Sequence, residues 1–168
     1  RLTSPLNVSS TYASGDFERL HPSTVYKLTN SEENKLGLPM PSGVVRFYDK
    51  DGSGDLQFIG AADMAQLAKG EKAELAIGEA FDIYADGKIT AQNKLSEKMA
   101  ENEVSVTFHN AKGRDAAVEF VQTFYYQTEI VSESLPSDRS KARTFKWLAN
   151  VPAGGETTLT YKVRVTYN

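Results

Sequence analysis

The stretch with the strongest chemical character is residues 49–55, which read Asp-Lys-Asp-Gly-Ser-Gly-Asp. Four residues fall at the first, third, fifth and seventh positions of a calcium-binding loop: Asp49, Asp51, Ser53 and Asp55. The twelfth position, where such a loop has a bidentate Glu, is Gly60, and strand-like segments flank the loop instead of helices. We therefore expect a hairpin tip without a tightly bound metal, while a weak response to millimolar calcium stays open.

The histidines and paired carboxylates offer little chemistry at the level of the sequence. His21 and His109 are far apart, and His109 falls on the polar face of an alternating stretch. A metal centre or a catalytic site needs several such groups to converge. The pair Glu32 and Glu33 lies in a turn-like segment, where solvation explains it. The sequence therefore predicts no catalytic, cofactor-binding or metal-binding residues and no cofactor.

Six aromatic side chains near the C-terminal end could stack on a sugar ring or a partner protein. They are Phe120, Phe124, Tyr125, Tyr126, Phe145 and Trp147. Their period-two spacing places most of them in a core. Tyr125 does not share the alternation of Phe124 and Tyr126 and so should point to the opposite face. It is therefore the one candidate binding residue of the set.

The elements that position these residues are predicted to be strands, because apolar and polar residues alternate through most of the chain. The expected strands cover residues 25–29, 44–48, 56–60, 71–77, 81–84, 88–90, 104–109, 118–126, 144–151 and 159–165. Asp86-Gly87 is a strong hairpin-turn signal. Residues 61–69 favour a loop with one helical turn, and residues 93–102 resemble a surface excursion or linker.

The spacing of turn signals at about 8–12 residues is typical of β-sandwiches. We therefore expect an all-β, antiparallel β-sandwich fold with two immunoglobulin-like units. The expected division is near residues 78–81, with an N-terminal unit at 1–79 and a C-terminal unit at 80–168.

Composition narrows the possible partners. The formal net charge is -3, which gives no electrostatic case for nucleic acid. The chain has 0 cysteines, so disulfides and thiolate metal sites are excluded. No apolar run approaches the ~20 residues of a membrane helix, so membrane insertion is not expected. Since Arg1 is not preceded by a methionine or signal-like segment, we interpret the chain as part of a longer protein.

Several motifs together resemble the bacterial domain-of-unknown-function 4139 family. They lie at residues 34–46, which contain Leu-Gly-Leu-Pro and Pro-Ser-Gly-Val-Val-Arg, and at 69–72, 78–82 and 151–165. The resemblance covers residues 26–167 and departs from the pattern at 61–66 and 96–100. It implies the C-terminal all-β region of an exported bacterial protein of the mucoidy-inhibitor type, with more of the parent chain upstream. No functional residues are defined for that family.

These observations favour a non-enzymatic β-sandwich module of the periplasm or cell envelope that binds protein or glycan, or spaces other parts of its parent chain. The alternative is an envelope-polymer hydrolase whose carboxylates converge only in three dimensions. A deep cleft with two facing carboxylates or a His–carboxylate pair would favour the alternative.

Overall fold

The computed structural model describes the backbone of residues 6–11, 17–50 and 53–167, and the side chains from Glu18 onward within those ranges. Strands dominate this part of the chain, which contains no α-helix and a single short 3-10 turn at Glu32–Asn34. The prediction of an all-β fold with antiparallel sheets is therefore confirmed. No helix in these ranges has the length and hydropathy for a membrane span.

The chain forms two compact units. The first contains Arg1–Pro5 and Ser23–Glu79, and the second contains Leu6–Pro22 and Ala80–Asn168. The sequence interpretation grouped residues 6–22 with the first unit. They cluster with the second because strand β1 (Leu6–Thr11) pairs with β9 (Ala116–Thr123), and β2 (Phe17–Leu20) pairs with β7 (Ile83–Ser96).

The first unit consists of two antiparallel strand pairs. These are β3 (Ser23–Thr29) with β6 (Lys72–Glu79), and β4 (Gly43–Lys50) with β5 (Leu56–Met64). Phe47, Met64 and Leu75 from these strands form a small core with Leu67, which lies between β5 and β6. Leu75 lies on the apolar face of β6 predicted from the alternation of residues 71–77.

The expected loop with a helical turn at residues 61–69 is wrong in its first part. Residues 61–64 continue β5, because Met64 reaches the core and Gly43 pairs with it across the hairpin. The remaining residues pass through a bridge between Met40 and Leu67. Core burial thus outweighs the helix preference of Ala, Met and Gln in this segment.

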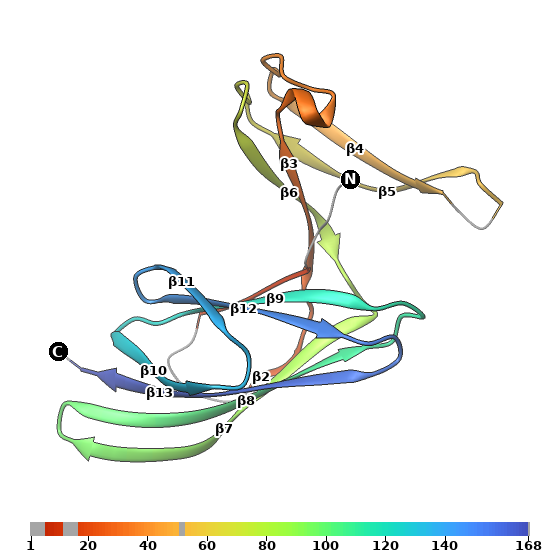
Figure 1. Cartoon of the computed structure of the whole chain (residues 1–168). Coiled ribbons are helices and arrows are strands. Elements are labelled where there is room, and N and C mark those ends of the chain that lie inside the picture. Colours follow the sequence, from red (N-terminus) through yellow and green to blue (C-terminus); the bar gives the residue numbers. More distant parts are fainter. Residues whose placement is uncertain (1–5, 12–16, 51–52, 168) are drawn as a thin grey trace. The chain divides into compact units, whose positions relative to one another are not determined.

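The second unit contains a five-stranded sheet in the order β10-β13-β8-β7-β2 (Figure 1). Its remaining members are β8 (Met99–Asn110), β10 (Gln127–Glu133) and β13 (Glu156–Thr166). The strands β11 (Ser137–Lys141), β12 (Thr144–Val151), β9 and β1 form a second sheet, in which β1 runs parallel to β9. This parallel pair is the exception to the antiparallel pattern among the pairings of these strands, and it joins segments far apart in sequence.

A single buried cluster draws side chains from both sheets of the second unit. Its largest fully buried members are Trp147, Phe108 and Phe120, and Phe120 stacks on Trp147 with ring centroids 5.8 Å apart. Truncating one such aromatic to Ala typically costs about 3–5 kcal/mol. The second unit is therefore held together by aromatic packing between strands that are remote in sequence.

Three expectations for the second unit are wrong. Asp86-Gly87 does not turn the chain but lies inside β7, where β8 and β2 pair with it on either side. For residues 93–102, expected to be a surface excursion or linker, the linker alternative is wrong, because they form the paired and largely exposed end of the long β7–β8 hairpin. The strand expected at 118–126 ends at Thr123, so Phe124 and Tyr126 lie in the following turn.

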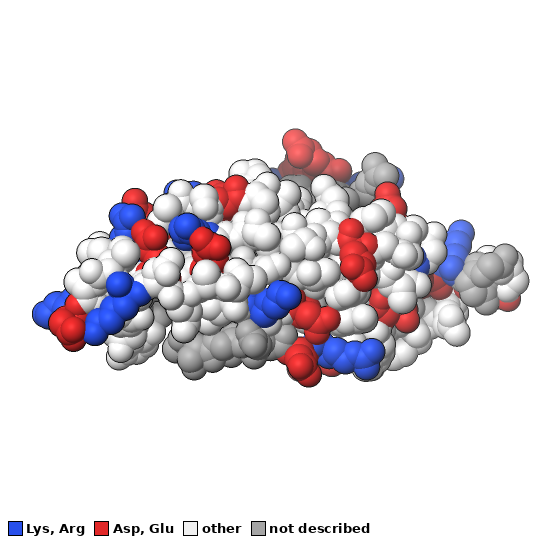
Figure 2. All heavy atoms as spheres, turned by 90° about the horizontal axis from the view of Figure 1, so that it is seen from below, with Lys and Arg blue, Asp and Glu red and all other residues white. Residues whose placement is uncertain are grey.

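Charge on the surface is mixed in sign. Figure 2 shows Lys and Arg interspersed with Asp and Glu over the face in view, without a large patch of one sign. Among described residues, several of these charges are paired across strands, including Lys162 with Glu103 and Arg164 with Glu101. Exposed pairs of this kind contribute little to stability, typically about 0–1 kcal/mol each.

Candidate functional site

The outer face of the five-stranded sheet carries the candidate site. Strand alternation sends Ile83, Ala85, Val106, Phe108 and Leu159 into the core, where each is fully buried. The residues between them therefore point outward, and nearly all of them are polar. These outward residues are Tyr84, Asp86 and Lys88 on β7, Ser105, Thr107 and His109 on β8, and Glu156, Thr158 and Thr160 on β13.

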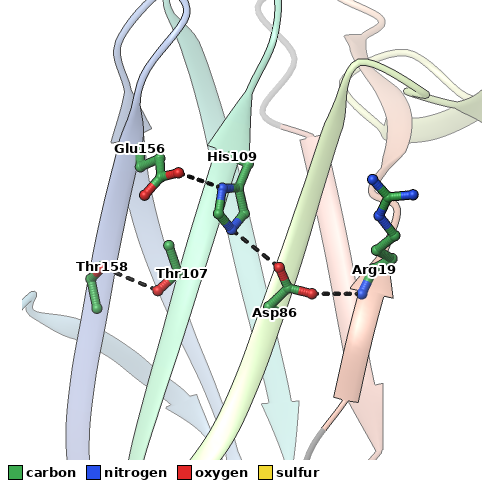
Figure 3. Close-up of polar contacts among 6 residues, drawn as sticks. All are labelled: Arg19, Asp86, Thr107, His109, Glu156 and Thr158. Carbon is green, nitrogen blue, oxygen red and sulfur yellow. Dashed lines mark hydrogen bonds and ion pairs between the residues drawn. The ribbon is translucent and has the colours of Figure 1, made fainter.

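His109 lies near the end of β8 and has a carboxylate at each ring nitrogen (Figure 3). Nδ1 is 2.9 Å from Glu156 Oε1, and Nε2 is 3.1 Å from Asp86 Oδ2. Glu156 is the direct cross-strand partner of His109 on β13, and Asp86 comes from β7 on the other side. Because an ionised carboxylate only accepts hydrogen bonds, the neutral imidazole donates to one of them and the imidazolium to both.

The second carboxylate oxygen of Asp86 fixes strand β2 to the same face. Asp86 Oδ1 accepts a hydrogen bond of 2.8 Å from the backbone N–H of Arg19, as Figure 3 shows. Arg19 has a φ of 49°, in the left-handed region that non-glycine residues seldom adopt. Such strained residues are over-represented at functional sites, where neighbouring contacts hold them in place.

An aromatic ring completes this row of side chains. Tyr84 stacks on His109 with centroids 4.4 Å apart and 14° between the planes. The Arg19 guanidinium carbon lies 5.2 Å from the centre of the Tyr84 ring. The row Arg19, Tyr84, His109 and Glu156 therefore crosses four neighbouring strands in mutual contact, so little side-chain freedom remains to be lost on binding.

Below this row the face is lined with hydroxyl groups and forms two hollows. The hollow next to His109 has a volume of about 700 Å³ and includes Lys88, Ser105 and Thr107. A second hollow of about 530 Å³ includes Ser105, Thr160 and Lys162. The hydrogen bond from Lys162 to Glu103 raises the pKa of Lys162, so that side chain is a cation at neutral pH.

The contacts of His109 bear on metal coordination and on proton transfer at this face. The two carboxylates approach opposite nitrogens of His109, so the three groups do not converge on one ion. Within the described ranges, no group of three or more His, Cys, Asp or Glu is arranged to hold a metal. A general base needs a ring nitrogen free to take a proton from substrate, whereas both nitrogens of His109 face carboxylates. The Thr107 hydroxyl is engaged with Thr158 at 3.2 Å.

The two histidines lie closer together than their sequence positions suggested. The ring of His21 is 6.2 Å from that of Tyr84, and its Nδ1 is 3.0 Å from the carbonyl oxygen of Ile83. His21 and His109 therefore both neighbour Tyr84, although only His109 contacts the carboxylates. Glu32 belongs to the first unit, where it pairs with Lys69.

The calcium-like segment forms the end of the β4–β5 hairpin, as expected, with Lys50 paired to Leu56. Asp51 and Gly52 lie outside the described residues. Asp49 Oδ1 accepts a hydrogen bond from the backbone N–H of Lys50 at 2.9 Å, which is ordinary turn chemistry.

The six aromatic side chains between residues 120 and 147 divide into buried and exposed members largely as predicted. Phe120, Phe145 and Trp147 are buried, whereas Tyr125 is 77% exposed. Tyr125 packs edge-on against Tyr126, and its carbonyl oxygen accepts a hydrogen bond of 2.9 Å from Arg143.

Asp86 and Glu156 were missed by the sequence interpretation. Asp86 was assigned to a turn because Asp-Gly is a strong turn signal, and Glu156 was included only in the C-terminal motif. The one available signal in the sequence was that His109 should point outward. The residues beside it on adjacent strands must then lie on the same face of the sheet.

Comparison of the chain with protein-family models, curated proteins and solved structures found no match, so the likeness to a domain-of-unknown-function family stays a prediction.

Proposed function

We propose that this chain is a non-enzymatic binding module of an exported bacterial protein, built from two immunoglobulin-like β-sandwich units. Its site is the outer face of β2, β7, β8 and β13, and its ligand is a glycan of the cell envelope. The observation that carries the proposal is the row of side chains from Arg19 to Glu156 beside a hydroxyl-lined hollow.

The chemistry of this face matches that of a sugar. Sugar hydroxyls both donate and accept hydrogen bonds, and the face offers both roles through Ser105, Thr107, Thr158 and the carboxylates of Asp86 and Glu156. The mutual contacts of Tyr84, His109 and Arg19 hold the polar groups in position before a ligand arrives. Preorganisation of this kind lowers the entropy cost of binding.

The envelope-polymer hydrolase remains the rival proposal, because a His–carboxylate arrangement is present. In its favour, Asp86 and Glu156 approach one histidine from opposite sides. Against it, His109 has no ring nitrogen directed to open solvent space, and the hollow is a surface trough rather than a deep cleft. Asp86 and Glu156 remain 41% and 64% exposed, whereas catalytic carboxylates are commonly desolvated.

A second candidate function, protein binding, is favoured by the β4–β5 hairpin. One face of this hairpin exposes four apolar side chains, each more than half accessible: Val44, Tyr48, Leu56 and Phe58. Tyr48 and Phe58 are cross-strand partners whose rings meet edge-on at 5.7 Å. Exposed apolar groups gathered on one face are typical of interaction surfaces.

The test is binding of the whole chain to insoluble peptidoglycan, chitin and cellulose, followed by calorimetry with soluble fragments of the polymer that retains it. We expect His109→Ala to lower affinity at least about tenfold, equivalent to about 1.4 kcal/mol. The control is Thr123→Ala, whose hydroxyl is paired with Thr144 on the other sheet. Equal retention of the wild type and His109→Ala would refute the site.

The same samples discriminate the hydrolase. Soluble sugar released by the wild type, and abolished by both Asp86→Asn and Glu156→Gln, would establish catalysis and overturn the non-enzymatic proposal. Retention without release of product supports binding.

A further inference from the structure

We infer that the ligand of this face is a linear, uncharged oligosaccharide several sugar rings long, lying along the strands and not a single ring in one hollow. This inference rests on the proposed function and specifies the size and charge of its ligand.

The first step is that the two hollows belong to one trough. Both lie on the same outer face, and Ser105 lines both of them. The strand register connects them: Lys88, Ser105 and Thr160 are successive cross-strand partners on β7, β8 and β13. A ligand that leaves the hollow beside His109 along β8 therefore passes over Ser105 and enters the hollow beside Lys162.

The second step is the length of this trough. The outward positions on β8 run from His109 through Ser105 to Glu103. At a rise of about 3.3 Å per residue, the six steps from His109 to Glu103 span about 20 Å. One sugar ring leaves most of that length empty, whereas a linear oligosaccharide contacts both hollows.

The third step is the charge of the ligand. Carboxylates outnumber cations in the trough, because the side chains of Glu18, Asp86, Glu103 and Glu156 line it, whereas the carboxylate of Glu133 is bonded to Trp147 and Arg139. The cations are Arg19, Lys88 and Lys162, and Lys162 is already paired with Glu103 at 2.7 Å. An acidic polymer or a nucleic acid would meet net repulsion there, whereas an uncharged glycan would not.

The fourth step distinguishes a glycan from a peptide. Strands β7, β8 and β13 each have a paired neighbour on both sides, so their backbone groups are used within the sheet. An extended peptide binds a sheet chiefly by adding to a free edge, which this face does not provide. The central part of the trough offers the hydroxyls of Ser105 and Thr160 in place of apolar pockets for side chains.

The experiment is calorimetry of the full chain with two uncharged series, cello-oligosaccharides and chito-oligosaccharides, from monosaccharide to hexasaccharide. We expect affinity for the preferred series to rise at least about tenfold between disaccharide and hexasaccharide, as the second hollow becomes occupied. Ser105→Tyr places a bulky side chain at the junction and should abolish this rise, so that the variant binds hexasaccharide no more tightly than it binds disaccharide. Thr160→Tyr provides a second obstruction nearby. The matched control is Thr123→Tyr on the other sheet, and circular dichroism verifies that each variant folds.

The outcomes separate the two proposals. Equal affinity for every length, or a rise that survives both Ser105→Tyr and Thr160→Tyr, overturns the inference and leaves the proposed glycan function standing. Tighter binding of the acidic polymer polygalacturonate overturns the uncharged ligand only. Failure to bind any sugar, with or without binding of oligolysine as a model basic peptide, overturns both proposals.

Discussion

Asn110 offers the sharpest test of how the second unit is held together, because its side chain joins three segments of the chain. Nδ2 donates to the carbonyl oxygens of Arg114, Val151 and Pro152 at 2.9, 3.2 and 3.1 Å, and Oδ1 accepts from the backbone N–H of Lys112 at 3.0 Å. The residue is only 3% exposed. Asn110→Ala therefore removes every one of these bonds at a site that water barely reaches.

The expected loss of stability follows from the backbone groups that Asn110→Ala leaves without a hydrogen-bond partner. A buried polar group deprived of its hydrogen bond costs about 1–3 kcal/mol. The carbonyl of Val151 is the most enclosed, since Val151 is fully buried, while the turn around Lys112 can recover part of its loss from solvent. We expect Asn110→Ala to lower the free energy of unfolding of the second unit by about 3 kcal/mol.

The assay is urea unfolding followed by tryptophan fluorescence. The chain has a single tryptophan, Trp147, which is fully buried in the core of the second unit. Its fluorescence emission therefore reports the unfolding of that unit alone. The control is Asn150→Ala, an exposed position on β12, which should change stability by less than about 0.5 kcal/mol. If Asn110→Ala costs no more than this control, the three-carbonyl contact does not stabilise the unit and the reasoning is refuted.

Three further predictions concern ionisable groups. Burial tends to raise the pKa of Glu133, but hydrogen bonds from Ser137 and the indole N–H of Trp147 outweigh it and hold that pKa below its ordinary value. The resulting stability is present near neutral pH and is lost as the pH falls through the lowered pKa, so Glu133→Gln should flatten the acid limb of a fluorescence-monitored stability curve. Burial raises the pKa of Tyr161, so stability should decline once the pH exceeds the unfolded value of about 10, and Tyr161→Phe should reduce that decline in alkaline urea titrations. Thermal melts with calcium and with chelator should overlay, and Asp51→Ala should cost about 0.5 kcal/mol; a calcium-dependent rise in Tm that this substitution abolishes would instead reveal a metal site.

The sequence was most informative where burial alternates along a strand. Alternation predicted a strand at residues 159–165, and its apolar members Leu159, Tyr161, Val163 and Val165 are all buried in β13. Lys162, between them, lies on the outer face. Period-two burial is a local property, so it can be identified before any strand partner is known.

Local turn signals failed where two neighbouring strands determine the conformation. Asp86-Gly87 has the composition of a hairpin turn, yet pairing of β7 with β8 and with β2 keeps it extended. The pairing of Gly87 with Phe17 involves a segment far away in the sequence. No property of the dipeptide itself predicts that partner, so propensity alone could not give the correct structure.

The candidate site was unpredictable for the same reason. His109 was correctly placed on a polar face, but its two carboxylates come from different strands and meet it only in the observed register. A slip of one residue in either strand would turn Asp86 or Glu156 toward the core. The contacts of Asn110 were equally beyond sequence reasoning, because its three carbonyl partners lie on segments that only the tertiary fold brings together.

The discontinuity of the second unit has a consequence for biosynthesis. All the strands of residues 23–79 have been synthesised once Glu79 has left the ribosome. By contrast, β1 cannot pair with β9, and β2 cannot pair with β7, until those later strands have been synthesised. Strand pairing between such remote segments is slow, because the intervening chain must first be closed into a loop. The nascent chain therefore carries an unpaired β2 until β7 is made and an unpaired β1–β9 edge until β9 is made, and this is the interval when a holdase chaperone would protect it best. The hydrogen bond of 2.9 Å from Ala80 N to Pro22 O suggests a remedy for recombinant production. Because these two residues are neighbours, a short turn could replace the intervening segment, place β2 directly before β7 in the chain and shorten the wait of β1 for β9.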